Sequence, residues 1–139
     1  MASTSTNTNI SPYLFLTASL LNALAVPGHI IFGRQNVDPT LRALQGRSDS
    51  PTHAVGLAAA RVGFEHMTVG IFAAAILNYR WSATNGPQGR DEHALFWALL
   101  GGGWWVGRRY WRVGEYGPLV LCLWGPPLCS LAAWALAQH

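Results

Sequence analysis

Long apolar stretches limit what this chain can fold into more than any other feature. Four can be drawn, each near the roughly 20 residues that a helix needs to cross a bilayer: approximately Tyr13 to Phe32, His53 to Asn78, His93 to Val113, and Tyr116 to Ala137. None alternates with a period of two, which excludes a transmembrane barrel. We therefore predict an all-α integral membrane protein with four transmembrane helices in an up-down-up-down bundle.

The composition agrees with a membrane environment. Of 139 residues, 50% are hydrophobic and 11% are charged, whereas soluble domains carry about 25% charged residues. The basic residues are all arginines at the ends of apolar stretches and form no stripe, so we expect no nucleic-acid partner. Residues 1–12 read as a disordered polar tail and residues 13–139 as a single four-helix transmembrane domain.

The arginines also predict an orientation. More of them lie in the first loop and at the third junction than in the second loop. The positive-inside rule then places loops one and three in the cytoplasm and both termini on the lumenal or external side. We expect the endoplasmic reticulum or another internal membrane.

Several short motifs predict irregular helices. Pro27-Gly28 is expected to interrupt the first helix, and Asp38-Pro39 to start a short interfacial helix. The glycines at 101–103 predict close approach of a neighbouring backbone or room for a ligand. Gly125-Pro126-Pro127 is expected to break the last helix near its middle.

The second apolar stretch contains ionisable residues, which are costly in hydrocarbon. Arg61, Glu65 and Thr68 have the spacing i, i+4, i+7 and share one helical face, with His66 beside them. On the first helix, Asn22 and His29 also share a face. We expect both faces to turn inward and to meet.

Two interpretations of this stripe stay open. Arg61 and Glu65 could form an internal salt bridge that only locks the bundle. Alternatively, Glu65 or His66 handles protons while Arg61 holds an anionic group or a developing oxyanion. His29 could act as an acid or could cap the carbonyl freed by Pro27.

A second cluster lies at the end of the third stretch. Arg109 and Tyr110 could form an anion-binding site at the membrane surface, or the arginines could simply reach the headgroups. Trp104 lies deeper in the stretch and is expected to pack or to line a pocket. The five histidines show no metal-ligand spacing, so we predict no metal site.

At these two clusters the chain resembles the MAPEG superfamily of four-helix microsomal glutathione transferases and leukotriene-type synthases. Arg61, Glu65 and Thr68 stand at the positions of that family's R-x-x-x-N-x-x-E pattern, and Arg109-Tyr110 begins its R-Y-x-x-G-Y pattern. Gly114 and Tyr116 follow later than in the family. Residues 37–43 resemble its first loop, so the resemblance covers about residues 34–117.

The resemblance implies a homotrimer that binds glutathione at its subunit interfaces and takes a lipophilic electrophile, often an epoxide, from the membrane. On the second helix, Glu65 replaces an amide and Thr68 replaces a carboxylate. A member that has lost glutathione and uses Glu65 as its own acid or base fits these departures.

The leading hypothesis is a membrane-embedded enzyme that opens, hydrolyses, isomerises or cyclises a lipophilic electrophile such as an epoxide, with no required cofactor. Glu65 would be the base, His29 or His66 the acid, and Arg61 would orient Glu65 or bind an oxyanion. The substrate would contact a wider set: Asn22, Thr68, Trp104, Arg109 and Tyr110. The alternatives are a glutathione transferase of MAPEG type and a non-catalytic scaffold or transporter subunit, with membrane lipid and further copies, as dimer or trimer, as partners.

Overall fold

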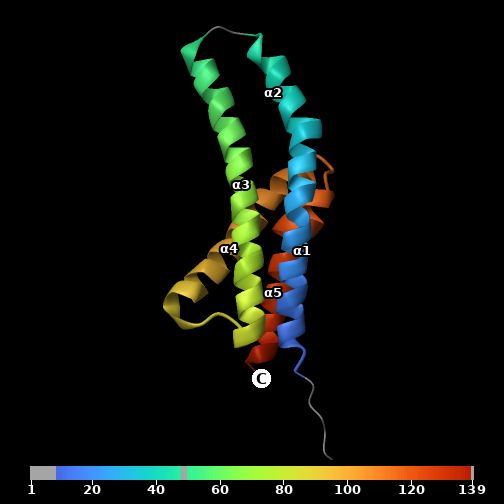
Figure 1. Ribbon diagram of the computed structural model, residues 1–139, viewed down its shortest axis with the longest axis vertical. Coiled ribbons are helices and arrows are strands. Elements are labelled where there is room, and N and C mark those ends of the chain that lie inside the picture. The colour runs from blue at the N-terminus through green and yellow to red at the C-terminus, as the bar shows by residue number, and fades with distance from the viewer. Residues whose placement is uncertain (1–8, 48–49, 139) are drawn as a thin grey trace, which may run out of the picture.

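The chain is helical throughout the part that the structure describes. The computed structural model describes residues 9–47 and 50–138, and these contain no strand. The elements are α1 (Ser11–Phe32), η1 (Gly33–Val37), α2 (Asp38–Gln45), α3 (Pro51–Thr84), α4 (Gly89–Arg112), η2 (Leu119–Leu123) and α5 (Gly125–Ala137). The long helices alternate in direction, and the C-terminus lies at the same end as the start of α1 and the α3–α4 turn (Figure 1).

Among the residues that the structure describes, three helical segments, not four, are long and apolar enough to cross a membrane. They are Ser11–Gln45, Pro51–Thr84 and Leu119–Ala137. The predicted third span is a helix, α4, but charges crowd both of its ends. The uncharged stretch between them, from His93 to Gly107, is shorter than the roughly 20 residues that a span needs.

Helix α1 packs against both α3 and α5. A buried apolar cluster lies near the start of α1 and consists of Phe15, Trp81, Phe96 and Ala133. Further along α1, the Ser19 hydroxyl donates a hydrogen bond to the carbonyl of Ala75 at 2.8 Å. These contacts fix the relative position of three helices and leave α4 to close the remaining side.

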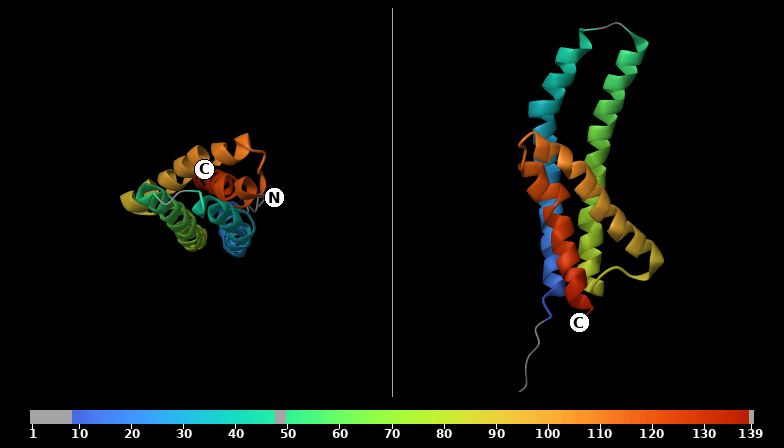
Figure 2. Two further views of the ribbon diagram at one scale, coloured as in Figure 1. Left: turned by 90° about the horizontal axis from the view of Figure 1, so that it is seen from above. Right: turned by 180° about the vertical axis from the view of Figure 1, so that it is seen from behind.

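Helix α4 crosses the others obliquely instead of running parallel to them (Figures 1 and 2). It contacts η2 and α5 through glycines, since a Cβ atom at Gly103 would lie 2.5 Å from the Leu123 carbonyl oxygen and one at Gly107 would meet the Trp124 ring. The predicted close approach is therefore confirmed at Gly103. Gly101 and Gly102 face open space.

The first helix is continuous through Pro27, so the predicted interruption there is wrong. The irregularity comes later, in the wider π-helical turn η1, where Gly33 lies against the Phe64 ring. Helix α2 follows η1 directly, so the predicted separate interfacial helix instead extends α1. Pro39 lies in the first turn of α2, directly after the π-helical turn η1.

The predicted break in the last helix is confirmed. The chain bends at Trp124, between η2 and α5, and Pro126 and Pro127 lie in the first turn of α5. At the other end of the chain, α1 begins at Ser11, inside the predicted polar tail. Residues 1–8 of that tail lie outside the described residues.

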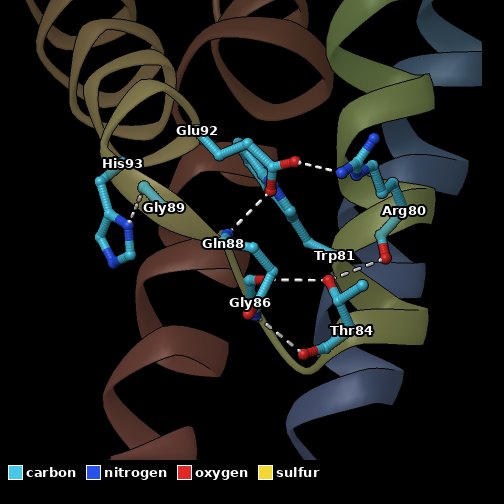
Figure 3. Close-up of polar contacts among 8 residues, drawn as sticks. All are labelled: Arg80, Trp81, Thr84, Gly86, Gln88, Gly89, Glu92 and His93. Atoms are coloured by element: carbon cyan, nitrogen blue, oxygen red, sulfur yellow. Dashed lines mark hydrogen bonds and ion pairs between the residues drawn. The ribbon is translucent and has the colours of Figure 1, made fainter.

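The turn between α3 and α4 is held by a polar network (Figure 3). Asn85 adopts the left-handed conformation that ends α3, and Gly86 and Gly89 also have positive φ angles. Glu92 reaches back over the turn to Arg80, Trp81 and the backbone of Gln88. Asp91 and Glu92 occupy the first turn of α4, where negative charge is favourable.

Candidate intramembrane pocket

The predicted stripe on α3 does not form one inward-facing group. The side chains of Arg61, Glu65 and His66 are all exposed. Arg61 pairs with Asp38, with Nη2 and Oδ1 3.1 Å apart. Among described residues Glu65 has no hydrogen-bonding or ionic partner, so the predicted Arg61–Glu65 bridge is wrong. The reason is the continuous η1–α2 segment, which carries Asp38 alongside α3.

The length of α3 explains how these charges can be exposed. Its 34 residues span about 51 Å at 1.5 Å per residue, whereas the hydrocarbon core of a bilayer is about 30 Å thick. Its buried residues begin at Ile71 and continue to Trp81. The packed half of α3 is therefore the C-terminal half, and Arg61 and Glu65 precede it.

His29 and Thr68 do meet, as expected. His29 Nδ1 lies 3.0 Å from Thr68 Oγ1, and the imidazole stacks on the Phe64 ring with centroids 4.0 Å apart and planes 9° apart. Thr68 fixes one ring nitrogen and Phe64 fixes the ring plane. The other nitrogen, Nε2, forms no hydrogen bond with a described residue, which leaves it available to a ligand.

His29 lines an open pocket of about 480 Å³ between α1, α3, α4 and η2. We call it the His29 pocket. Its walls are mainly apolar and aromatic, including Phe32, Phe64 and Met67, and its polar side chains are His29, Tyr110 and Cys122. The Tyr110 ring packs edge-on against Phe32, with centroids 6.3 Å apart. Such a site suits a lipophilic molecule with one polar group.

A second pocket, of about 260 Å³, lies deeper towards the buried cluster. We call it the Asn22 pocket, and its lining includes Asn22, Asn78, Trp81, Phe96 and Ser130. The two pockets share five lining residues: Met67, Ile71, Val106, Cys122 and Leu123. The two pockets therefore adjoin beneath the oblique α4, and we call the pair the tract.

The other predicted site residues lie outside this tract. Arg109 is exposed. Trp104 is 55% exposed and stacks on Trp124 with ring centroids 4.9 Å apart. It lines a third pocket, of about 400 Å³, which shares Leu100, Leu123 and Pro127 with the Asn22 pocket. Of the predicted second cluster, only Tyr110 reaches the His29 pocket.

Sequence reasoning missed Phe64, Met67 and Cys122 as lining residues. Phe64 and Met67 flank the predicted stripe, and Phe64 lies four residues before Thr68, so the helical spacing could have placed them beside His29. Cys122 lies in the π-helical turn η2. A π-helical turn points its side chains in other directions than a regular helix does. The helical periodicity of the sequence therefore does not predict that Cys122 lines the pocket.

No group of three or more His, Cys, Asp or Glu side chains able to hold a metal ion occurs among the residues that the structure describes. No protein-family model, curated protein or solved structure matches the chain. The resemblance to the MAPEG superfamily thus stays a prediction.

Proposed function

We propose that this protein is a membrane-embedded enzyme that binds a lipophilic small molecule in the tract and transfers a proton at His29. Support for the membrane comes from the three long apolar segments. Their outer surfaces carry large exposed hydrophobic side chains, among them Leu24, Phe72, Ile76, Val120 and Leu128. A contiguous apolar surface of this kind suits lipid better than water.

The fixed imidazole in an apolar pocket is the observation that carries the proposal. A histidine can donate or accept a proton near neutral pH. With Nδ1 held by Thr68 and the ring held by Phe64, Nε2 is positioned for a polar group of the ligand. The Tyr110 hydroxyl, in the same pocket, supplies a second hydrogen-bond donor.

The chemistry that fits best is the opening of an epoxide. The His29 imidazolium gives its proton to the epoxide oxygen as the C–O bond breaks. A water molecule, or a hydroxyl of the same substrate, attacks the carbon and returns a proton to His29. Hydrolysis and cyclisation differ only in that nucleophile, and both leave the enzyme unchanged.

The proton-transfer role is tested by comparing His29→Gln with Glu65→Gln. We expect His29→Gln to lower the turnover of cis-9,10-epoxyoctadecane by about 100-fold or more, the usual contribution of a general acid or base. The purified protein is reconstituted in liposomes, and products are measured by mass spectrometry. Circular dichroism and thermal unfolding check that both variants are folded.

The Glu65→Gln variant distinguishes proton transfer at His29 from proton transfer at Glu65. Glu65 is exposed and lies outside the His29 pocket, so its replacement should lower turnover far less than that of His29. A loss confined to Glu65→Gln would instead return the acid/base role to Glu65. Equal turnover in all three proteins would contradict both assignments and favour a non-catalytic binding or scaffold role.

Glutathione conjugation is the second candidate, favoured by Tyr110 in the pocket and by the adjacent exposed Arg108, Arg109 and Arg112. These guanidinium groups could bind the carboxylates of an anionic tripeptide. Glutathione should then raise the unfolding temperature of the wild-type protein. Glutathione should raise the unfolding temperature of an Arg109→Gln variant by a smaller amount. The absence of any shift in the wild type would argue against a thiol cosubstrate.

A further inference from the structure

Asn22 is a buried amide without a protein partner. Its residue is only 3% exposed, it lines the Asn22 pocket, and its side chain forms no hydrogen bond with a described residue. An unpaired amide in an apolar interior is unfavourable. Ligand-binding pockets, in contrast, commonly place a few polar groups in apolar walls.

Three polar side chains buried near Asn22, those of Ser19, Asn78 and Ser130, are paired, whereas Ser11, Trp124 and Trp134 elsewhere in the fold carry buried polar atoms without a partner among the described residues. Ser19 donates to the Ala75 carbonyl at 2.8 Å. Asn78 donates to the Ala74 carbonyl at 2.9 Å and accepts a hydrogen bond from the Ser130 hydroxyl at 2.6 Å. Asn22 differs from these three because it has no such bond, and unlike Ser11, Trp124 and Trp134 it lines the Asn22 pocket.

The separation of Asn22 from His29 sets the distance between the two polar groups that a ligand would need. Both residues lie on α1 seven positions apart, which corresponds to about 10 Å along the helix axis. Both line the same tract, because the two pockets adjoin through Ile71, Val106 and Leu123. A ligand that fills the tract would pass both polar groups.

We infer that the ligand is an elongated lipophile with two oxygen functions about 10 Å apart, one facing His29 and Tyr110 and the other facing Asn22. An amide both donates and accepts, so a hydroxyl or a carbonyl satisfies Asn22. This inference rests on the proposed function and adds the substrate class to it. The second oxygen fixes how deeply the ligand enters the tract and therefore which of its atoms lies at His29.

Two ketones test the inference without undergoing ring opening. The first, 9-octadecanone, carries a single carbonyl for His29 and Tyr110, and the second, 1-hydroxy-9-octadecanone, adds a hydroxyl near the required separation. Apparent affinities are measured by tryptophan fluorescence for the full chain in lipid nanodiscs. We expect the hydroxyketone to bind about five-fold more tightly, the usual gain from one added hydrogen bond.

Asn22→Leu should abolish this five-fold preference, because leucine cannot form a hydrogen bond with the added hydroxyl. The matched control is Ser19→Ala, which alters a buried polar side chain one turn away on the same helix. Because Ser19 bonds to the protein and lies outside the lining of both pockets, its replacement should keep the preference.

The unfolding temperature separates a binding role from a structural one. Asn22→Leu removes no protein hydrogen bond and should keep or raise the unfolding temperature. Asn78→Leu removes the bonds to Ala74 and Ser130 and should lower it. An Asn22→Leu variant that is destabilised as strongly as Asn78→Leu would make Asn22 structural and overturn the inference.

The binding outcomes keep the two proposals distinct. Equal affinity for the two ketones, or a preference that persists in Asn22→Leu, overturns the two-oxygen ligand and leaves the proposed function standing. If neither ketone binds and cis-9,10-epoxyoctadecane is not turned over, the proposed function and this inference both fail.

Discussion

Glu92 organises the α3–α4 turn through three contacts (Figure 3). Its Oε2 accepts hydrogen bonds from the Gln88 backbone N–H at 2.8 Å and from Trp81 Nε1 at 2.9 Å, and its Oε1 lies 2.7 Å from Arg80 Nη2. The Gln88 bond is the main cause that lowers the pKa of Glu92, and Trp81 and Arg80 lower it further against the opposing effect of partial burial.

This lowered pKa predicts an acid-sensitive turn. The ionised carboxylate stabilises the fold fully above its ordinary pKa of 4.5, and that stabilisation is lost as the pH falls through the lowered value. The unfolding temperature in detergent should therefore drop as the pH is taken below about 4.5. Glu92→Gln should lower stability at neutral pH and flatten the acid dependence.

The matched control for Glu92 is Asp91→Asn. Asp91 lies in the same helical turn but is exposed and forms no hydrogen bond or ion pair with a described residue. This change should leave the acid dependence of the wild type in place. Acid sensitivity that is equal in Glu92→Gln and the wild type would assign it to other groups.

At the scale of elements, the three consecutive glycines of α4 have different roles. Gly103 lies against the backbone of Leu123, whereas Gly101 and Gly102 have open space where a Cβ atom would be. The close contact sets where α4 crosses η2 and so how far its middle stands from α1 and α3. The shape of the two pockets thus depends on Gly103.

Gly103→Ala should lower the free energy of unfolding by about 1–3 kcal/mol, because an added methyl group meets a backbone oxygen that cannot rotate away. Gly101→Ala should instead raise it by about 0.5–1 kcal/mol, since alanine favours the helix and nothing opposes it. Denaturant unfolding of the two variants measures both values. Destabilisation of equal size at the two positions would contradict the close contact.

At the scale of the whole molecule, the two ends differ in charge. The loop from α3 to α4 lies at the same end as the C-terminus (Figure 2), and it is flanked by Arg80 near the end of α3 and Arg90 in the first turn of α4. The segment from Arg34 to Arg47 and the last five residues of α4, 108–112, carry six further arginines and lie away from that end. By the positive-inside rule, this second end is predicted to face the cytoplasm.

Cysteine labelling tests that orientation. With Cys122 and Cys129 changed to Ser, single cysteines at Gln45 and Gln88 are exposed to a membrane-impermeant maleimide in sealed vesicles. Gln45→Cys should label only from the cytoplasmic side and Gln88→Cys only from the other side. Labelling of both positions from one side would contradict a membrane-spanning α3.

The sequence by itself determined the class of structure. The apolar stretches predicted long helices without strands, the Gly-Pro-Pro motif predicted the break before α5, and the glycines of α4 predicted a close backbone contact. Helix formation and helix breaking are local, because they depend on residues within a few turns, and a run of glycines marks where another backbone can come close. Even the failure of α4 as a span follows from charges that are visible at its ends.

Only the tertiary structure decided which polar groups face the interior. Spacing placed Arg61, Glu65 and Thr68 on one face of α3, but their surroundings depend on how α1, η1 and α2 run beside it. Arg61 forms an ion pair with Asp38, Thr68 forms a hydrogen bond with His29, and Glu65 is exposed. The tract between His29 and Asn22 likewise exists because α4 crosses obliquely, and a crossing angle is set by packing between distant residues.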